Sequence, residues 1–238
     1  MDLDLNKNNK TFKEYFHTII NSRVETFINE LSDNHTTYLF SGVLRNYFLN
    51  IYEQPRDLDI VLKRKMPSSN LIHILNKYGN YKLNAFGGFK INIKGLSIDI
   101  WYIEDTWAIK NNFVKTLNEP IETTVLKSTF FNFSSILYNF KDNKFIYNKI
   151  FEDFYKSKTI DIVVEDNLSE LLCLINIVYY SEKFELNLST KVKQYFICRF
   201  KNYTRQNFDD IQIKHFNTIK YDYPLLDKFY KNLNYFFR

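Results

Sequence analysis

One short segment constrains the fold of this chain more than any other feature. Residues 57–63 carry an aliphatic side chain at every second position from Leu58 onward, while Asp57 and Asp59 occupy two of the intervening positions. Alternation with a period of two predicts a half-buried β-strand. Because residues i and i+2 of a strand point to one face, the two carboxylates are expected to project together, with the aliphatic side chains pointing into a core.

The paired carboxylates predict a site for divalent cations. Two like charges about 6–7 Å apart repel each other unless a cation lies between them, and hard oxygen ligands suit Mg²⁺. A third acid, Asp99, lies within the apolar run 97–101. Taken alone, Asp99 is expected to be an acid whose hydrogen bonds are satisfied within the fold. Beside the pair Asp57 and Asp59, it is expected to be a third carboxylate aimed at the same metals. The alternative for Asp57 and Asp59 is a solvated strand end with two acids.

A candidate anion-binding turn precedes the acidic strand. Ser41-Gly42 separates a β-rich run at 37–40 from a predicted helix at 43–51. Small residues let backbone N–H groups approach an anion, and a helix N-terminus adds the positive end of its dipole. Arg45, one turn into the helix, carries a guanidinium that suits phosphate oxygens. A glycine needed for steric reasons and an ordinary surface arginine are the alternative interpretations.

The remaining pattern predicts a helical start, a central set of strands and a helical end. Helices are expected over 9–31, 43–51, 68–78 and 168–180, and strands over 37–40, 57–63, 81–86, 89–93 and 97–103. Lys94-Gly95 is typical of a two-residue hairpin turn, and the pattern beyond Pro120 is mostly helical. This order predicts an α/β domain with a helical appendix.

Composition excludes several classes of protein. Of the 238 residues, 45% are hydrophobic and 18% are aromatic, which supplies enough apolar surface for a core and excludes disorder as the main state. Two cysteines are too few for a disulfide framework or a cysteine-based zinc site. No apolar run reaches the roughly 20 residues that span a bilayer, and no segment resembles a signal peptide. We therefore expect a soluble, cytoplasmic protein with no membrane partner.

Positive charge is concentrated in the last quarter of the chain. Residues 183–238 hold eleven Lys and Arg against five Asp and Glu, a net charge of +6, whereas residues 1–182 sum to −1. The same quarter is dense in Tyr and Phe. A basic surface interleaved with rings is typical of nucleic-acid binding. An aromatic helical core with lysines facing water explains the pattern equally well.

The acidic strand and the turn before it resemble a known enzyme family. Residues 38–46 followed by 56–61 look like the head of the tRNA nucleotidyltransferase/poly(A) polymerase family, within the DNA polymerase β-like nucleotidyltransferase superfamily. The family pattern is a Gly-Gly or Gly-Ser turn, an arginine-bearing helix, Asp-x-Asp and a distal third Asp. Residues 86–100 match the hairpin and the third-acid strand in order and spacing, and residues 130–138 and 167–184 are more weakly similar.

The resemblance implies an overall organisation. It implies an α/β (α+β) nucleotidyltransferase head, in which a small mixed β-sheet is flanked by helices, followed by a mostly helical neck-like region. The corresponding divisions are an N-terminal helical extension at 1–34, the head at 35–140 and the neck-like domain at 141–238.

The resemblance also implies a reaction, the transfer of a nucleoside monophosphate from an NTP to an RNA 3′ end with release of pyrophosphate. The favoured acceptor is tRNA, bound through the basic aromatic C-terminal region. The implied catalytic and metal-binding residues, which would hold two Mg²⁺ ions or Mn²⁺ in their place, are Asp57, Asp59 and Asp99, and the implied nucleotide-binding residues are Ser41, Gly42 and Arg45. Lys63 and Arg64 are either further phosphate ligands or solvated strand-end charges.

The chain departs from the family pattern in places that concern the choice of base. Lys127-Ser128-Thr129 stands where the family has Arg-Arg-Asp, and residues 166–171 contain no arginine where the family neck carries an Asp and Arg that pair with the incoming base. The chain is also shorter than full CCA-adding enzymes. Two alternatives follow: a toxin- or defence-type nucleotidyltransferase that modifies a protein or small molecule, and an inactive homologue that binds nucleotide or RNA.

Overall fold

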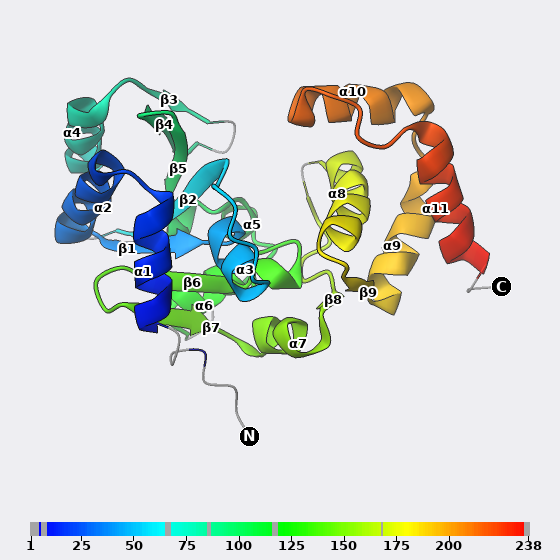
Figure 1. Ribbon diagram of the computed structural model, residues 1–238, viewed down its shortest axis with the longest axis horizontal. Helices are drawn as coiled ribbons and strands as arrows, with labels where there is room; N and C mark the ends of the chain where they lie inside the picture. The colour runs from blue at the N-terminus through cyan, green and yellow to red at the C-terminus, as the bar shows by residue number, and fades with distance from the viewer. Residues whose placement is uncertain are drawn as a thin grey trace. The chain divides into compact units, whose positions relative to one another are not determined.

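The computed structural model describes Leu5 and residues 9–64, 68–84, 87–115, 119–167 and 169–235 (Figure 1). The α-helices are α1 (Asn9–Ile19), α2 (Ser22–Asn34), α3 (Gly42–Phe48), α4 (Ser68–Tyr78), α5 (Trp107–Lys110), α6 (Ile121–Leu126), α7 (Lys149–Ser157), α8 (Glu170–Lys183), α9 (Thr190–Phe200), α10 (Arg205–Phe216) and α11 (Tyr223–Tyr235). The strands are β1 (Thr36–Phe40), β2 (Asp57–Lys63), β3 (Tyr81–Leu83), β4 (Phe89–Ile93), β5 (Leu96–Tyr102), β6 (Ile136–Asn139), β7 (Lys144–Tyr147), β8 (Thr159–Ile160) and β9 (Asn187–Leu188). Two short 3₁₀ helices are η2 (Ile103–Asp105) and η3 (Asn132–Ser134).

The chain forms two compact units. The first comprises residues 1–129 with 133–153, and the second comprises residues 130–132 with 154–238. The first unit contains the large sheet and both N-terminal helices, α1 and α2. It continues beyond the head boundary expected at 140, because β6 and β7 pair as a hairpin across that position.

The first unit is built on a mixed sheet with the strand order β3-β4-β5-β2-β1-β6-β7. Strands β2 and β5 are parallel, and the other neighbouring pairs in this sheet are antiparallel. Parallel strands need a crossover connection, which α4, β3 and β4 supply here. With the mostly helical second unit, this arrangement confirms the expected α/β class.

The hairpin between β4 and β5 has the geometry that its sequence predicts. Lys94 and Gly95 have φ angles of 53° and 90°, the left-handed backbone that a two-residue turn of type I′ needs at both positions. The turn sets Ile93 opposite Leu96, and the register then continues outward along both strands. This turn therefore fixes which residue of β4 lies beside each residue of β5.

The N-terminal segment forms two helices where the sequence predicts one over 9–31. The break falls at Ile20 and Asn21, and the Asn21 side chain accepts hydrogen bonds from the backbone N–H groups of Arg23 and Val24 at 3.1 and 3.0 Å. This is an N-cap, which starts a new helix and lets α2 run in a new direction. The apolar periodicity continues through the break, so the hydrophobic pattern alone does not reveal it.

A second difference is the β6–β7 hairpin, which lies where the sequence pattern is mostly helical beyond Pro120. All four residues of β6 are buried. A strand buried on both faces shows no alternation of polar and apolar residues, so its period cannot be distinguished from that of a buried helix.

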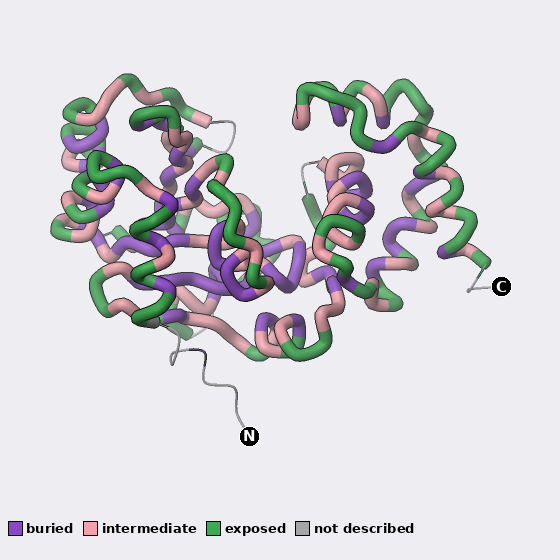
Figure 2. Tube along the Cα trace, in the orientation of Figure 1, coloured by how far each residue is buried: buried purple, intermediate pink, exposed green. Residues whose placement is uncertain are grey.

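The buried residues lie at the centre of the sheet and on the inner faces of the helices (Figure 2). On β2, Leu58 and Ile60 are fully buried and form part of the core, whereas Asp57 and Asp59 are half-buried. On α8 the buried side chains cluster at Cys173–Ile175 and at Ile177 and Val178. Within the described ranges, no helix is both long and apolar enough to cross a membrane.

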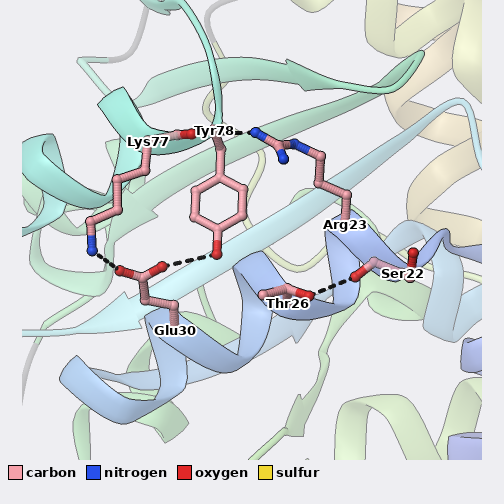
Figure 3. A pocket seen from close by; sticks show the side chains of 6 residues that line it. All are labelled: Ser22, Arg23, Thr26, Glu30, Lys77 and Tyr78. Atoms are coloured by element: carbon pink, nitrogen blue, oxygen red, sulfur yellow. Dashed lines mark hydrogen bonds and ion pairs between the residues drawn. The ribbon is translucent and has the colours of Figure 1, made fainter.

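Helix α2 is joined to α4 by a polar cluster around a pocket (Figure 3). The Glu30 carboxylate accepts hydrogen bonds from Lys77 Nζ at 2.5 Å and from the Tyr78 hydroxyl at 2.9 Å. Arg23 donates to the Lys77 carbonyl oxygen at 3.3 Å, and its guanidinium lies 5.4 Å from the centre of the Tyr78 ring. The charged groups that line this pocket are therefore paired with one another, and they hold α2 against α4.

Glu30→Gln is expected to lower the free energy of unfolding by about 0.5–1 kcal/mol at pH 7, because it removes a partly exposed ion pair. The hydrogen bond from Lys77 is the main cause that lowers the pKa of Glu30 below its usual value of 4.5. A lowered carboxyl pKa stabilises the fold above pH 4.5, and this contribution is lost as the pH falls through the folded-state pKa. Denaturant unfolding of both proteins at pH 7 and pH 3 should therefore show a smaller difference in acid, and a constant difference would contradict this expectation.

Aromatic side chains form the core of the second unit. Phe196, Phe200 and Phe208 are fully buried, and the Phe200 ring lies 5.4 Å from that of Phe196 and 5.0 Å from that of Tyr230. Lys201 Nζ lies 4.7 Å from the centre of the Tyr230 ring. This arrangement agrees with the helical-core interpretation of the aromatic C-terminal quarter.

Candidate functional site

Three acidic side chains share one face of the central sheet. Asp59 on β2 lies directly beside Asp99 on β5, in register, and Asp57 lies beside Ser97. Neighbouring residues in register project to the same face, as do residues two apart on one strand. The structure therefore brings together the three acids, Asp57, Asp59 and Asp99, that the sequence singles out.

Two of the acids, Asp59 and Asp99, belong to a row of side chains that crosses five strands. In strand order the row is Lys82 on β3, Lys90 on β4, Asp99 on β5, Asp59 on β2 and Phe40 on β1. Positive charge therefore lies on one side of the carboxylates and an aromatic ring on the other. The row ends one residue before the turn that begins at Ser41, so this turn and the acids lie at the same part of the sheet.

Each outer carboxylate pairs with a cation. Lys90 Nζ lies 2.8 Å from Asp99 Oδ2, and a guanidinium nitrogen of Arg56 lies 2.8 Å from Asp57 Oδ2. The other oxygen of Asp99 accepts a hydrogen bond from the Asn84 amide nitrogen at 3.2 Å. These contacts orient the Asp57 and Asp99 carboxylates, and they partly neutralise the negative charge of the cluster.

Asp59, in the middle of the cluster, has a strongly raised pKa. Burial is the main cause, followed by the negative charges of Asp57 and Asp99, and together they raise the pKa of Asp59 from 3.8 to about 7. The cations of Arg56 and Lys90 act in the opposite direction but do not cancel the rise. A divalent cation would relieve this repulsion, because an opposite charge favours the ionised carboxylate.

The donor chemistry fits a hard divalent cation, since three carboxylates supply the oxygen ligands that Mg²⁺ and Mn²⁺ prefer. Among the residues that the structure describes, no three His, Cys, Asp or Glu side chains converge as a group that could hold a metal ion. Asp57 and Asp99 point toward Arg56 and Lys90 instead. For all three acids to bind one cation together, Asp57 and Asp99 must therefore give up their contacts with Arg56 and Lys90.

The turn that precedes α3 has an unusual backbone. Ser41 has φ 56° and ψ −102°, a conformation that glycine adopts more readily than serine. Its hydroxyl forms a 2.8 Å hydrogen bond with the Ser134 hydroxyl, which secures the turn to η3. A Cβ atom added to Gly42 would meet no atom within 4 Å, so the space beside this glycine is open. Open space beside a strained turn is compatible with a ligand close to the backbone.

Replacing Ser41 by glycine and by alanine should separate backbone strain from the loss of the hydroxyl. Both variants lose the hydrogen bond to Ser134, but only glycine relieves the strained φ angle. Ser41→Gly is therefore expected to be about 1–2 kcal/mol more stable than Ser41→Ala. Thermal or denaturant unfolding measures the difference, and equal stability of the two variants would show that Ser41 is unstrained.

Arg45 is held by neighbours on its own unit. Its guanidinium donates to the Asn46 side-chain oxygen at 3.1 and 2.9 Å and lies 5.3 Å from the centre of the Phe133 ring. Asn46 and Phe133 thus orient this cation beside the Ser41 turn. The binding of a nucleotide by Gly42 and Arg45 stays a prediction.

Lys63 and Arg64 lie at the opposite end of β2 from Asp57 and form ion pairs there. Lys63 Nζ lies 3.0 Å from Glu122, and an Arg64 nitrogen lies 3.3 Å from Asp105. This agrees with the interpretation of these residues as strand-end charges rather than as phosphate ligands.

Three residues of the site were not predicted from the sequence: Arg56, Asn84 and Lys90. Lys90 could have been found, because the two-residue turn at Lys94-Gly95 fixes the hairpin register and sets Lys90 opposite Asp99. Asn84 lies one residue beyond the paired residues of β3, where no strand register fixes the direction of its side chain. No periodic signal in the sequence indicates its contact with Asp99.

The fold resembles that of solved tRNA nucleotidyltransferases. A CCA-adding enzyme bound to CTP aligns with 87% of this chain and 51% of its own, at TM-score 0.59 and 15% identity. The Thermotoga maritima CCA-adding enzyme in complex with tRNA aligns with 83% and 48% of the two chains, at TM-score 0.59 and 14% identity. A tRNA nucleotidyltransferase with a primer tRNA and an ATP analogue gives TM-score 0.53 at 17% identity, covering 75% and 52%.

These similarities define the fold of the chain as that of the CCA-adding enzymes. The chain spans about half the length of the solved structures that it matches. No known protein family and no curated protein matches the sequence. The likeness to the tRNA nucleotidyltransferases, expected from residues 38–46, 56–61 and 86–100, is therefore confirmed at the level of the fold.

Proposed function

We propose that this chain is a metal-dependent nucleotidyltransferase that transfers a nucleoside monophosphate from an NTP to an RNA 3′ end, with a tRNA-like acceptor. The observation that carries the proposal is the in-register pair Asp59 and Asp99, with Asp57 on the same face, in a fold shared with CCA-adding enzymes. Three carboxylates beside a strained turn are suited to a triphosphate and its cations. Solved neighbours with CTP and with tRNA support the choice of substrates.

In the proposed reaction, the 3′-hydroxyl oxygen of the acceptor bonds to the α-phosphorus of the NTP. The bond between that phosphorus and the oxygen bridging to the β-phosphate breaks, the hydroxyl proton passes to solvent, and pyrophosphate leaves. Asp57, Asp59 and Asp99 would hold two Mg²⁺ ions, or Mn²⁺ in their place. Bound divalent cations supply Lewis-acid stabilisation of the attacking and leaving oxygens.

On this proposal, the turn and the first helix bind the triphosphate. The backbone N–H groups at Ser41 and Gly42 and the guanidinium of Arg45 are the groups that would contact phosphate oxygens. The open space at Gly42 supports close approach of a ligand, and the contacts of Arg45 with Asn46 and Phe133 support its orientation.

RNA binding is attributed to the positive charge of the C-terminal region and not to three of its phenylalanine rings. The buried Phe196, Phe200 and Phe208 are engaged in the core, so they do not offer faces to bases. The net charge of +6 over 183–238 remains and suits a phosphate backbone. On this account, affinity for RNA should fall steeply with salt and depend weakly on base sequence.

A labelled-transfer assay tests the proposal. Purified protein is incubated with Mg²⁺ or Mn²⁺, each of four α-labelled NTPs in turn, total cellular RNA and protein lysate. The double variant Asp57→Ala/Asp59→Ala, with its fold checked by circular dichroism, is the control. Label on tRNA that the double variant fails to transfer supports the proposal and identifies the base.

Other outcomes of the same assay contradict the proposal. Label on protein or on a small molecule would favour the toxin- or defence-type alternative, for which the absence of an arginine from residues 166–171 is the motivating difference. No label with any NTP, together with NTP binding in calorimetry, would favour an inactive binding homologue. Activity retained by the double variant would exclude the carboxylate site.

A further inference from the structure

We propose that Lys90 is an internal counter-cation of the carboxylate site, which competes with a divalent cation for Asp99 and then contacts the phosphates of the bound nucleotide. The part of this inference that concerns phosphates rests on the proposed function, whereas the competition does not. Its basis is the 2.8 Å contact between Lys90 Nζ and Asp99 Oδ2 at the centre of the carboxylate row.

The two partners differ in their freedom to move. The Asp99 side chain is 17% exposed, and its second oxygen accepts a hydrogen bond from the Asn84 amide, so this carboxylate is the more restrained of the two partners. The Lys90 side chain is 49% exposed and carries its charge on a flexible four-carbon stem. When a divalent cation arrives, the ammonium is therefore the group that moves away more freely.

Charge along the row indicates where the ammonium would go. Lys82 lies beyond Lys90 on the edge strand, and the carboxylates lie on the other side. A displaced Lys90 therefore remains beside the cation site, within reach of anionic groups brought by that cation. A metal-bound nucleoside triphosphate has its negative phosphates beside the metal, so one lysine can serve first the carboxylate and then the phosphate.

The simpler alternative is a structural role. A cross-strand pair of opposite charges stabilises a sheet by roughly 0.2–1 kcal/mol, and Lys90 with Asp99 is such a pair. If this were its whole role, removing the lysine would lower stability slightly and leave metal affinity unchanged. Competition predicts the opposite effect on the metal, because an ammonium beside a cation site repels the cation.

The test compares Lys90→Gln with Lys82→Gln, a matched variant on the same row one strand further from the acids. Mn²⁺ binding is measured by electron paramagnetic resonance and calorimetry without nucleotide or acceptor, after unfolding curves confirm that both variants fold. Lys90→Gln is expected to bind Mn²⁺ about fivefold more tightly than the wild type, and Lys82→Gln to stay within about twofold, because an exposed charge is screened over roughly 10 Å.

The second stage adds ATP to the Mn²⁺-loaded proteins. Lys90→Gln is expected to bind ATP about tenfold more weakly, although it binds Mn²⁺ more tightly, because it lacks a charged hydrogen bond to phosphate. Unchanged or weaker Mn²⁺ binding by Lys90→Gln, equal effects of the two variants, or no Mn²⁺ binding by any of the proteins would overturn the inference. Because the first stage contains no substrate, tighter Mn²⁺ binding can hold even if no nucleotide transfer is found.

Discussion

Asp59→Asn is expected to abolish nucleotide transfer and at the same time to stabilise the protein above neutral pH. Asp59 is the central carboxylate of the three-acid cluster, with Asp57 on its own strand and Asp99 directly beside it on β5. Losing its charge removes a ligand from any cation bound there, and an effect of several kcal/mol on the barrier corresponds to a rate loss of about 1,000-fold. The same change removes the repulsion that raises the pKa of this group.

The sign of the stability effect follows from the pKa. Asp59 titrates at about 7 in the folded chain and near 3.8 otherwise, so between these values the folded state retains a proton that the unfolded state has lost. The contribution of this group to stability therefore falls as the pH rises from 3.8 to 7 and stays low above. The neutral Asn avoids this penalty, which amounts to about 4 kcal/mol for a shift of this size.

Denaturant unfolding in the presence of a chelator measures the effect. Asp59→Asn should exceed the wild type in stability at pH 8 and match it at pH 4. Asp105→Asn is a suitable control, because this acid pairs with Arg64 at the other end of the sheet and should change stability little at either pH. An Asp59→Asn protein less stable than the wild type at pH 8 would contradict the prediction. It would mean that the neighbouring cations already offset the negative charge of the carboxylates.

Gly88→Ala is expected to destabilise the first unit by about 2–3 kcal/mol and to disturb Asp99, because the new methyl group has no room. A Cβ atom at Gly88 would lie 2.8 Å from the Ile100 carbonyl oxygen and 3.0 Å from the Trp101 Cβ atom. It would also lie 3.1 Å from the Asn84 amide nitrogen, the group that donates to Asp99.

Two hydrogen bonds restrain the backbone at Gly88, so it cannot easily shift to make room for the new methyl group. Its N–H donates to the Asn84 side-chain oxygen at 2.9 Å, and its carbonyl accepts from the Asn84 N–H at 2.8 Å. A shift of Gly88 therefore moves Asn84, and with it one of the contacts that orient Asp99. We expect a loss of roughly tenfold in transfer rate in addition to the loss of stability, since about 1.4 kcal/mol corresponds to a factor of ten.

Thermal unfolding and the transfer assay measure these effects, with Gly87→Ala as the matched control. A Cβ atom at Gly87 meets no atom within 4 Å, but this residue has φ 84°, so alanine is expected to cost about 1 kcal/mol through backbone strain alone. A Gly88→Ala protein as stable as Gly87→Ala would show that the sheet can yield at this position.

The strands that carry the site could be predicted from local pattern. Residues 57–63 form β2 as expected, because one face of this strand is aliphatic and the other is not. The turn at Lys94-Gly95 needs a left-handed backbone, which identifies the β4–β5 hairpin and fixes its register. Together they place the acids on strands and set Lys90 beside Asp99.

Other contacts depend on parts of the chain that the sequence does not connect locally. Asp59 and Asp99 become neighbours because β2 and β5 pair as parallel strands. A long crossover connects these strands, so no turn in the sequence fixes which of their residues lie side by side. The pairing of Asp57 with Arg56 depends on side-chain direction at the strand end. The break at Asn21 and the buried strand β6 were missed because neither changes the apolar pattern around it.

The most direct test of the carboxylate face as a metal-nucleotide site is a crystal structure with Mn²⁺ and a non-hydrolysable ATP analogue, with Mn²⁺ located by anomalous scattering. The account predicts Mn²⁺ bound to Asp59 together with Asp57 or Asp99, and a triphosphate that extends toward Ser41 and Gly42. Mn²⁺ and nucleotide bound elsewhere on the chain, with the Lys90–Asp99 and Arg56–Asp57 pairs intact, would contradict it.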